Sequence, residues 1–296
     1  MACLTLASPS TIAARGDLGA ILNESASTMK IGKETIPRTS ISTSNAHTIV
    51  VRGRDLANDL IGKVSFTDYF YLLVTGNMPT PAASAVLNAT LVAIAEHGLV
   101  PSVQASRMTL AAAPDALQGA VAAGILGCGP VILGASESCG KLLDEVRQCA
   151  AQTGDLSGAA FTVVTRYRAE KRPVPGYGHP LHKERDPRVA ALFDVAERSG
   201  AELTYARIAQ AIEGVLPDVY GKALMLNVSA AIPAVLLGIG FPLAALKGVP
   251  ILARTAGLIG HLTEELSHSI GFALSYQATR DVVYDGETPE GFEPGI

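Results

Sequence analysis

Apolar residues recur along most of the chain with the three- and four-residue spacing of amphipathic helices, and glycine and proline interrupt them at intervals. The pattern predicts helices over residues 65–76, 79–98, 114–130, 136–152, 157–171, 187–199, 205–215, 224–237 and 252–276. Residues 30–52 are rich in Thr, Ile, Ser and Val with some alternation, which is typical of short strands or extended chain. We therefore expect an all-α fold with a short extended or strand segment near the N-terminus.

The same pattern divides the chain into three parts. We expect an N-terminal extended segment over residues 1–50 and a helical domain over residues 51–284. Residues 285–296 are acidic and contain glycine and proline, so we expect an exposed C-terminal tail.

Composition narrows the class of protein further. Hydrophobic residues make up 48% of the 296 residues and charged residues 17%, which is typical of a globular protein with much buried surface. The formal net charge is −4 and no basic block is present, so a nucleic-acid partner is not expected. The four cysteines, Cys3, Cys128, Cys139 and Cys149, lack the spacing of zinc ligands. Together with the lack of a signal-peptide pattern, they indicate a cytoplasmic protein with reduced thiols and no metal.

One stretch raises the alternative of a membrane helix. Residues 224–246 carry no charged side chain, and about 20 apolar residues are enough to cross a bilayer. However, Asn227, Pro233 and Pro242 interrupt the stretch, and no tryptophan flanks it. We therefore predict a buried core helix and no membrane partner.

Candidate chemistry gathers in residues 172–188. This stretch contains Gly176-Tyr-Gly-His-Pro-Leu-His-Lys183, followed by Asp186-Pro-Arg188 at the start of a predicted helix. The glycines allow a ligand to approach the backbone beside His179, and Arg188 can bind a carboxylate through two parallel hydrogen bonds. These residues favour a site for an anionic carbonyl compound. The alternative is a structural loop, in which Asp186 caps the helix and Arg188 faces solvent.

This segment resembles the Gly-x-Gly-His…Asp-Pro-Arg motif of the citrate synthase superfamily, and further blocks extend the resemblance over most of the chain. They are Arg52 to Pro79, Glu96-His97 with Ser102 and Arg107, Gly129 to Glu137, Asn227-Val228, and Ala253-Arg254 to Glu264. The chain is most similar to bacterial citryl-CoA lyases and to the citryl-CoA lyase module of ATP citrate lyase. The resemblance implies a citrate synthase-like multi-helix fold, with a small-domain portion around residues 172–222.

The resemblance also assigns the site. It implies that His179 polarises the carbonyl of a keto acid and that His97, Arg188 and Arg254 bind carboxylates. The two other catalytic groups of the family, an enol-stabilising histidine and an aspartate base, fall on Ile132 and Ser229. The arginine that follows the motif histidine falls on Pro180, and the family's late arginine, donated by the partner subunit, falls on Leu274. These losses indicate a substrate with fewer carboxylates than citrate.

The missing acid–base groups require replacements if the chain is an enzyme. His182 is the first candidate because it lies in the same loop as His179, although it is as well explained as a surface histidine. Glu137, His261 and His268 are the further candidates.

The expected function is that of a citryl-CoA lyase-like enzyme, which makes or cleaves a C–C bond in a short β-hydroxyacyl-CoA or keto acid system. A coenzyme A thioester is then a substrate, and no permanently bound cofactor is expected. The alternatives are a decarboxylase, a thioesterase, or a non-catalytic binder of a CoA thioester or dicarboxylate. The family implies a homodimer, whose apolar interface the uncharged residues 119–136 and 224–237 can supply.

Overall fold

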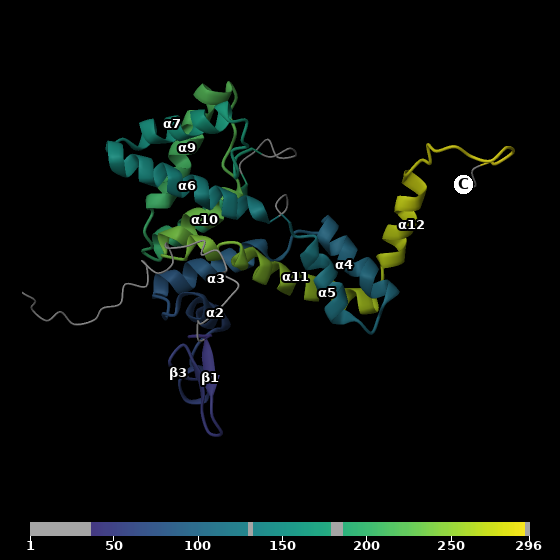
Figure 1. The fold of residues 1–296 in the computed structure, drawn as a ribbon, viewed down its shortest axis with the longest axis horizontal. Helices are drawn as coiled ribbons and strands as arrows, with labels where there is room; N and C mark the ends of the chain where they lie inside the picture. Colours follow the sequence, from purple (N-terminus) through teal and green to yellow (C-terminus); the bar gives the residue numbers. More distant parts are fainter. Residues whose placement is uncertain (1–36, 130–132, 179–185, 294–296) are drawn as a thin grey trace, which may run out of the picture. The chain divides into compact units, whose positions relative to one another are not determined.

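The computed structural model describes residues 37–129, 133–178 and 186–293 of the chain. The chain divides into two units after Thr39, and the named helices and strands of the described residues all belong to the second unit. This unit is predominantly helical (Figure 1), which confirms the predicted all-α class.

A small antiparallel sheet opens the second unit. Its strands are β1 (Ser42–Ser44), β2 (Ile49–Val51) and β3 (Arg54–Asp55), paired in the order β1-β2-β3. A π-helical turn, Leu56–Leu60, follows the sheet. The strand segment predicted near the N-terminus is therefore present.

The helices follow in one continuous series. They are α2 (Phe66–Thr75), α3 (Pro81–Ala95), α4 (Pro101–Ala112), α5 (Leu117–Leu126), α6 (Gly134–Thr153), α7 (Leu156–Ala169), α8 (Pro187–Arg198), α9 (Thr204–Tyr220), α10 (Val228–Gly238), α11 (Gly248–Ser267) and α12 (Gly271–Asp281). A short 3-10 helix, Leu243–Ala245, precedes α11.

Capping side chains explain why the predicted helix starts agree with the structure. Ser65 accepts a hydrogen bond from the Asp68 amide at the start of α2, and Thr80 accepts one from the Ala83 amide at the start of α3. Asp186 caps α8 in the same way, with Pro187 at the first helical position.

Two helix predictions were wrong. Residues 252–276 form two helices rather than one, because α11 ends at Ser267 and α12 begins at Gly271. The helix predicted from residue 224 begins at Val228, where the Asn227 side chain accepts a hydrogen bond from the Ser229 amide. The hydrophobic pattern also missed α4, since that helix buries the polar residues Ser102, Ser106 and Arg107.

Helix α10 lies in the main hydrophobic core. It packs against α6 and α9 (Figure 1), and its residues from Ala230 to Leu236 are almost fully buried. This position explains its lack of charge, because an unpaired charge inside a core is strongly unfavourable. Residues 230–236 are thus already covered within one chain, whereas Met225 is 37% exposed, so a dimer interface that involves residues 224–237 stays a prediction for the part outside 230–236.

By length and composition, one helical stretch of the described residues, Leu243–Ser267, is long and apolar enough to cross a membrane. Long core helices meet the same criterion. In the structure, α11 packs against α3, α4 and α5, and it carries the buried Arg254.

Candidate active site

The first site residue, His97, lies in the turn that follows α3. This helix ends at Ala95, Glu96 is extended, and Gly98 has a φ of +68° that turns the chain toward α4. Partial burial lowers the pKa of His97, and the positive charges of Arg188 and Arg254 lower it further. The three residues assigned to carboxylate binding therefore lie close enough to interact, and His97 is a neutral imidazole at pH 7.

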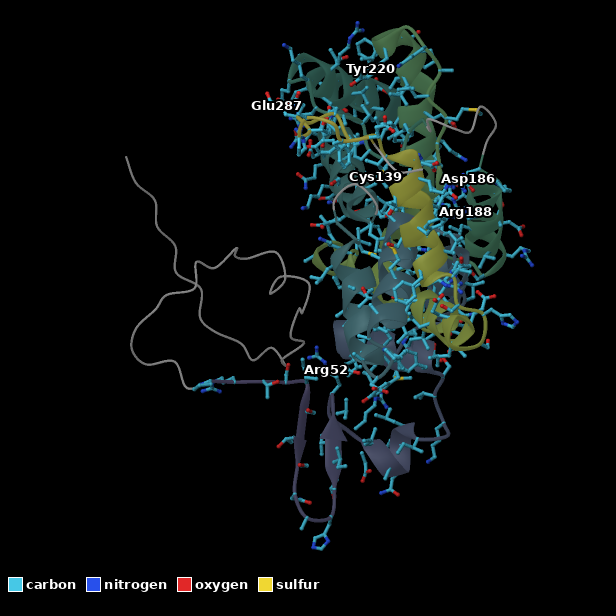
Figure 2. All side chains as sticks on the ribbon, turned by 90° about the vertical axis from the view of Figure 1, so that its right-hand side faces the viewer. Arg52, Cys139, Asp186, Arg188, Tyr220 and Glu287 are labelled. Carbon is cyan, nitrogen blue, oxygen red and sulfur yellow. The ribbon has the colours of Figure 1, made fainter. Side chains whose placement is uncertain are left out.

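Arg188 lies in the first turn of α8 and is held by Asp186. Its Nε and Nη2 atoms donate to the two carboxylate oxygens of Asp186 at 3.0 and 2.7 Å (Figure 2). Burial raises the pKa of Asp186, but the hydrogen bonds from Arg188 outweigh this effect and leave the pKa below its usual value. Asp186 thus both caps α8 and orients the guanidinium. The Arg188 side chain is 32% exposed and paired with Asp186, so it is only partly open to solvent.

Arg254 is the most unusual charge of the site. The residue is 4% exposed, and among the residues that the structure describes, its buried Nε and Nη1 atoms have no hydrogen-bond partner. Leaving a charged donor buried and unpaired is costly, so such a group is normally completed by an anion. We therefore regard Arg254 as the clearest sign of an anionic ligand in the described residues.

The loop that leads to His179 is fixed on the start of α10. Gly176 has a φ of +87°, and a Cβ atom there would lie 2.7 Å from the Ala230 Cβ. Tyr177 is buried and donates to the Ala209 carbonyl, while the Asn227 side chain donates to the Gly178 carbonyl at 2.8 Å. The backbone up to Gly178 is therefore rigidly placed. The two predicted catalytic residues that follow, His179 and His182, lie outside the described residues.

Ser229 stands on the first turn of α10, two residues after Asn227. The residue is half-buried, and its amide donates to the Asn227 side chain at 2.9 Å. The position assigned to the family's aspartate base is therefore next to the Gly176–Gly178 backbone, but it carries a hydroxyl. Ile132, the position assigned to the enol-stabilising histidine, lies outside the described residues.

The remaining acid–base candidates are occupied by other partners. Glu137 forms an ion pair with Lys141 at 2.7 Å, and His268 lies at the end of α11 beside the Ser267 hydroxyl. His261 bonds to Glu96, whose carboxylate lies in the turn of His97. Residue spacing alone did not indicate this role for Glu96, because the pair joins α3 to α11.

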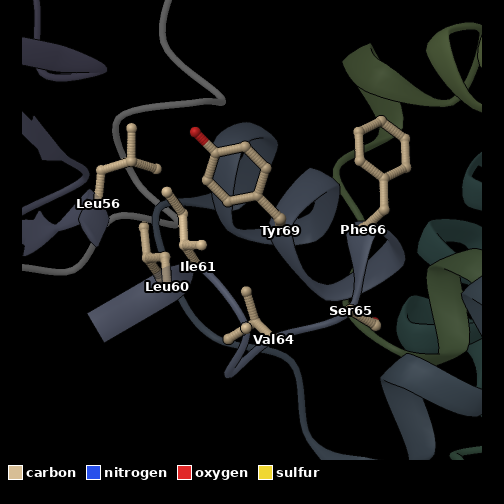
Figure 3. A pocket seen from close by; sticks show the side chains of 8 residues that line it. Leu56, Leu60, Ile61, Val64, Ser65, Phe66 and Tyr69 are labelled. Carbon is tan, nitrogen blue, oxygen red and sulfur yellow. The ribbon is translucent and has the colours of Figure 1, made fainter. Parts of the chain in front are cut away.

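Neither a metal nor an apolar pocket accounts for the site. Among residues 37–129, 133–178 and 186–293, no group of His, Cys, Asp and Glu is placed to hold a metal ion. A pocket of about 240 Å³ lies beside the start of α2 (Figure 3), but none of its lining residues is charged. The described cysteines, Cys128, Cys139 and Cys149, are free thiols.

The helical fold thus brings two arginines and a neutral histidine close together. Residues 79–271 match the family profile described as the C-terminal domain of citrate synthase. Because the match covers more than half of the chain, the protein belongs to the citrate synthase family.

Comparison with curated proteins agrees with this family. The chain is 29% identical over 211 residues to a citrate synthase of Synechocystis, with 69% of this chain and 51% of that protein covered. It is 29% identical over 199 residues to a citrate synthase of Deinococcus radiodurans, with 66% and 51% covered. The chain thus spans about half the length of these curated relatives.

A solved structure matches over almost its whole length. The citryl-CoA lyase of Hydrogenobacter thermophilus is 32% identical with a TM-score of 0.77, and the match covers 88% of this chain and 98% of that chain. The ATP citrate lyase of Methanothrix soehngenii, solved with citrate and coenzyme A, has a TM-score of 0.71 at 21% identity. That match covers 99% of this chain and 48% of the lyase, and it supports the fold.

Proposed function

We propose that the chain is a citryl-CoA lyase-like enzyme, which makes or cleaves a C–C bond in a short β-hydroxyacyl-CoA with a keto acid as the other product or substrate. The buried guanidinium of Arg254 carries this proposal. Its Nε and Nη1 atoms have no hydrogen-bond partner among the described residues, and it lies near Arg188 and His97, where a carboxylate would complete its hydrogen bonds. The likeness to a citryl-CoA lyase over nearly all of that protein's length supports the choice within the family.

The described residues suggest how the acid is held. Arg254 donates from the buried side of the site, and Arg188 donates from the start of α8, where the first amides of the helix also favour an anion. The neutral imidazole of His97 donates one further hydrogen bond. These contacts fix the carboxylate, so that the carbonyl carbon is positioned for reaction.

The bond-breaking step needs groups beyond these. In the cleavage direction, the tertiary hydroxyl loses its proton as the C–C bond breaks, and the products are a keto acid and the enolate of a CoA thioester, which then takes up a proton. On the basis of the family motif, we assign His179 as the residue that bonds this hydroxyl and the carbonyl oxygen formed from it. Ser229 at the position of the family's base is a poor proton acceptor, and losing such a group lowers turnover by about 10²- to 10⁴-fold.

Ser229 favours a second candidate function, a relative that binds a CoA thioester or dicarboxylate without cleaving it. Incubation with citryl-CoA separates the two, with keto acid measured by a coupled reductase and free thiol measured in parallel. Keto acid release supports the lyase, and free thiol without keto acid indicates thioester hydrolysis. Binding without either product supports the second candidate.

Variants then test the assignment of residues. For the lyase, His179→Ala should lower kcat, whereas Arg188→Ala should mainly raise KM. Equal and negligible effects of both substitutions would remove the site assignment. If the parent is inactive, Ser229→Asp combined with Ile132→His should produce citryl-CoA chemistry, provided that the architecture of the site is retained.

A further inference from the structure

A single carboxylate organises the turn that carries His97. The two Glu96 carboxylate oxygens lie 3.0 and 2.9 Å from the His261 Nε2 atom. The same carboxylate accepts the backbone N–H groups of Gly98 and His97. Burial raises the pKa of Glu96, but the hydrogen bonds from His261 and the two amides outweigh it, so the pKa lies below its usual value. Glu96 is therefore ionised, and its carboxylate links the His261 side chain to the backbone of the turn that carries His97.

His261 is itself held in place by the packing of α11 against α3. A Cβ atom at Gly257, one turn before His261, would lie 2.0 Å from the Ala95 carbonyl oxygen, so the two helices are in backbone contact there. The His261 side chain is 15% exposed. Because its Nε2 faces both oxygens of an ionised carboxylate, Nε2 must carry a proton.

This geometry excludes His261 as the missing acid–base group. Its Nε2 is engaged by Glu96, and its buried Nδ1 has no hydrogen-bond partner within residues 37–129, 133–178 and 186–293. Neither nitrogen is presented to a ligand, so the role of His261 is exerted through Glu96.

Helix α11 also supplies Arg254, about two turns before His261 and hence on nearly the same face. We propose that His261 is a positioning residue, which acts through Glu96 to hold the His97 side chain beside Arg254 and Arg188. Helix α11 then provides one anion-binding residue, Arg254, and fixes the turn that provides another, His97. The inference rests on the proposed function only for its kinetic readout.

The test compares three substitutions of His261. Leucine removes the donor to Glu96, asparagine keeps the polarity but is too short, and glutamine places an amide nitrogen near the position of Nε2. His268→Leu is the matched control, since His268 lies on the same helix end and its side chain contacts Ser267 instead. Far-ultraviolet circular dichroism and thermal unfolding check that each variant is folded.

The first readout is the titration of the His97 imidazole by NMR. Its signal is identified as the one that is missing from the His97→Gln variant. In the wild type, Arg188, Arg254, Asp186 and Glu96 act on this titration together with partial burial. His261→Leu and His261→Asn should move the His97 pKa up toward about 6.5, because the imidazole is no longer held beside the two guanidiniums. His261→Gln and His268→Leu should leave it at the wild-type value.

The second readout is citryl-CoA turnover. His261→Leu and His261→Asn should lower kcat/KM by about 10- to 100-fold, as expected from a displaced binding group, and His261→Gln should restore most of it. An unchanged His97 titration in His261→Leu, or a glutamine variant as impaired as leucine, would overturn the inference. If the wild type shows no turnover, the lyase proposal fails, while the His97 titration still decides whether His261 is a positioning residue.

Discussion

At the scale of single residues, Arg254 is charged and buried, and two of its donor atoms have no partner in the described part of the chain. A protein that only needed to fold would be more stable with an apolar residue there, because an uncompensated buried charge is unfavourable. The cost is understandable if a ligand supplies the missing hydrogen bonds. Stability and binding should therefore respond in opposite directions to substitution of Arg254.

Arg254→Met tests whether stability and binding respond in opposite directions. Without ligand, the free energy of unfolding should rise by about 1–3 kcal/mol, since the buried unpaired donors are removed. Binding of citrate, measured by calorimetry, should weaken at least about tenfold. A variant that is destabilised and still binds citrate like the wild type would show that Arg254 is a structural arginine.

The sequence motifs predicted His97, Arg188 and Arg254, and the structure places these three residues together. The partners of these residues were harder to predict. Asp186 was assigned as a cap, but its ion pair with Arg188 needs side-chain geometry. The Glu96–His261 pair depends on how α3 packs against α11, which residue spacing along one helix cannot show.

At the scale of elements, α11 connects the site to the rest of the fold through close packing. Gly257 lies against the Ala95 carbonyl oxygen, where a Cβ atom would be 2.0 Å away. At Gly260, about one turn further along the same helix, an added Cβ atom would meet no neighbouring atom within 4 Å. The two glycines therefore form a matched pair for substitution.

Gly257→Ala should push α11 away from α3 and lower the free energy of unfolding by about 1–3 kcal/mol, even though alanine favours the helix. Citrate binding should weaken as well, because Arg254 moves relative to His97. Gly260→Ala should raise stability by up to about 1 kcal/mol and leave binding unchanged. Urea denaturation and calorimetry measure both effects, and equal results for the two variants would show that contact between α11 and α3 at Gly257 does not matter.

Helix α12 is held by a buried carboxylate of the preceding helix. Glu265 is 3% exposed, pairs with the Arg107 Nε at 2.6 Å and accepts the Gly271 amide at 2.8 Å. It thus replaces the cap that α12 lacks within its own sequence. Since this carboxylate comes from α11, local pattern could not predict the break between the two helices.

Burial raises the pKa of Glu265, but hydrogen bonds from Ser269, Arg107 and the amides of α12 lower it to about 2. Because the folded pKa is below the unfolded one, the stabilisation is complete above about pH 4.5 and is lost as the pH falls toward 2. Glu265→Gln should lower the free energy of unfolding by about 3 kcal/mol at pH 7. It should also flatten the decline of stability over the same acidic range.

Glu264→Gln is the control for Glu265→Gln. Glu264 also pairs with Arg107, but its side chain is 59% exposed, so its loss should cost less than about 1 kcal/mol. Urea denaturation at a series of pH values measures both variants. A similar loss of stability in the two would show that burial of the ion pair does not matter.

At the scale of the whole molecule, apolar side chains remain uncovered at the C-terminal end. Phe272 and Tyr276 on α12 are 67% and 66% exposed, and Val282, Val283 and Tyr284 beyond it are exposed as well. Residues 230–236 of α10 are buried within one chain, whereas these side chains are exposed. We propose that the chain forms a homodimer that covers them.

Val283→Asp should then shift the chain from dimer to monomer at micromolar concentration, as measured by sedimentation velocity. Val92→Asp provides the control, since Val92 is also a highly exposed valine but lies on α3. A wild-type chain that sediments as a monomer, or a control that dissociates equally, would refute a dimer formed through this end.

The unpaired donors of Arg254 also make the stability of the folded chain sensitive to an anion that binds there. An anion that completes these hydrogen bonds binds the folded state and not the unfolded one, so it adds RT ln(1 + [L]/Kd) to stability. At a hundredfold excess over Kd, this amounts to about 2.7 kcal/mol, enough to raise the melting temperature by a few degrees. A melting screen of short keto and hydroxy acids, with Arg254→Met as the blank, would therefore rank candidate substrates before any reaction is known.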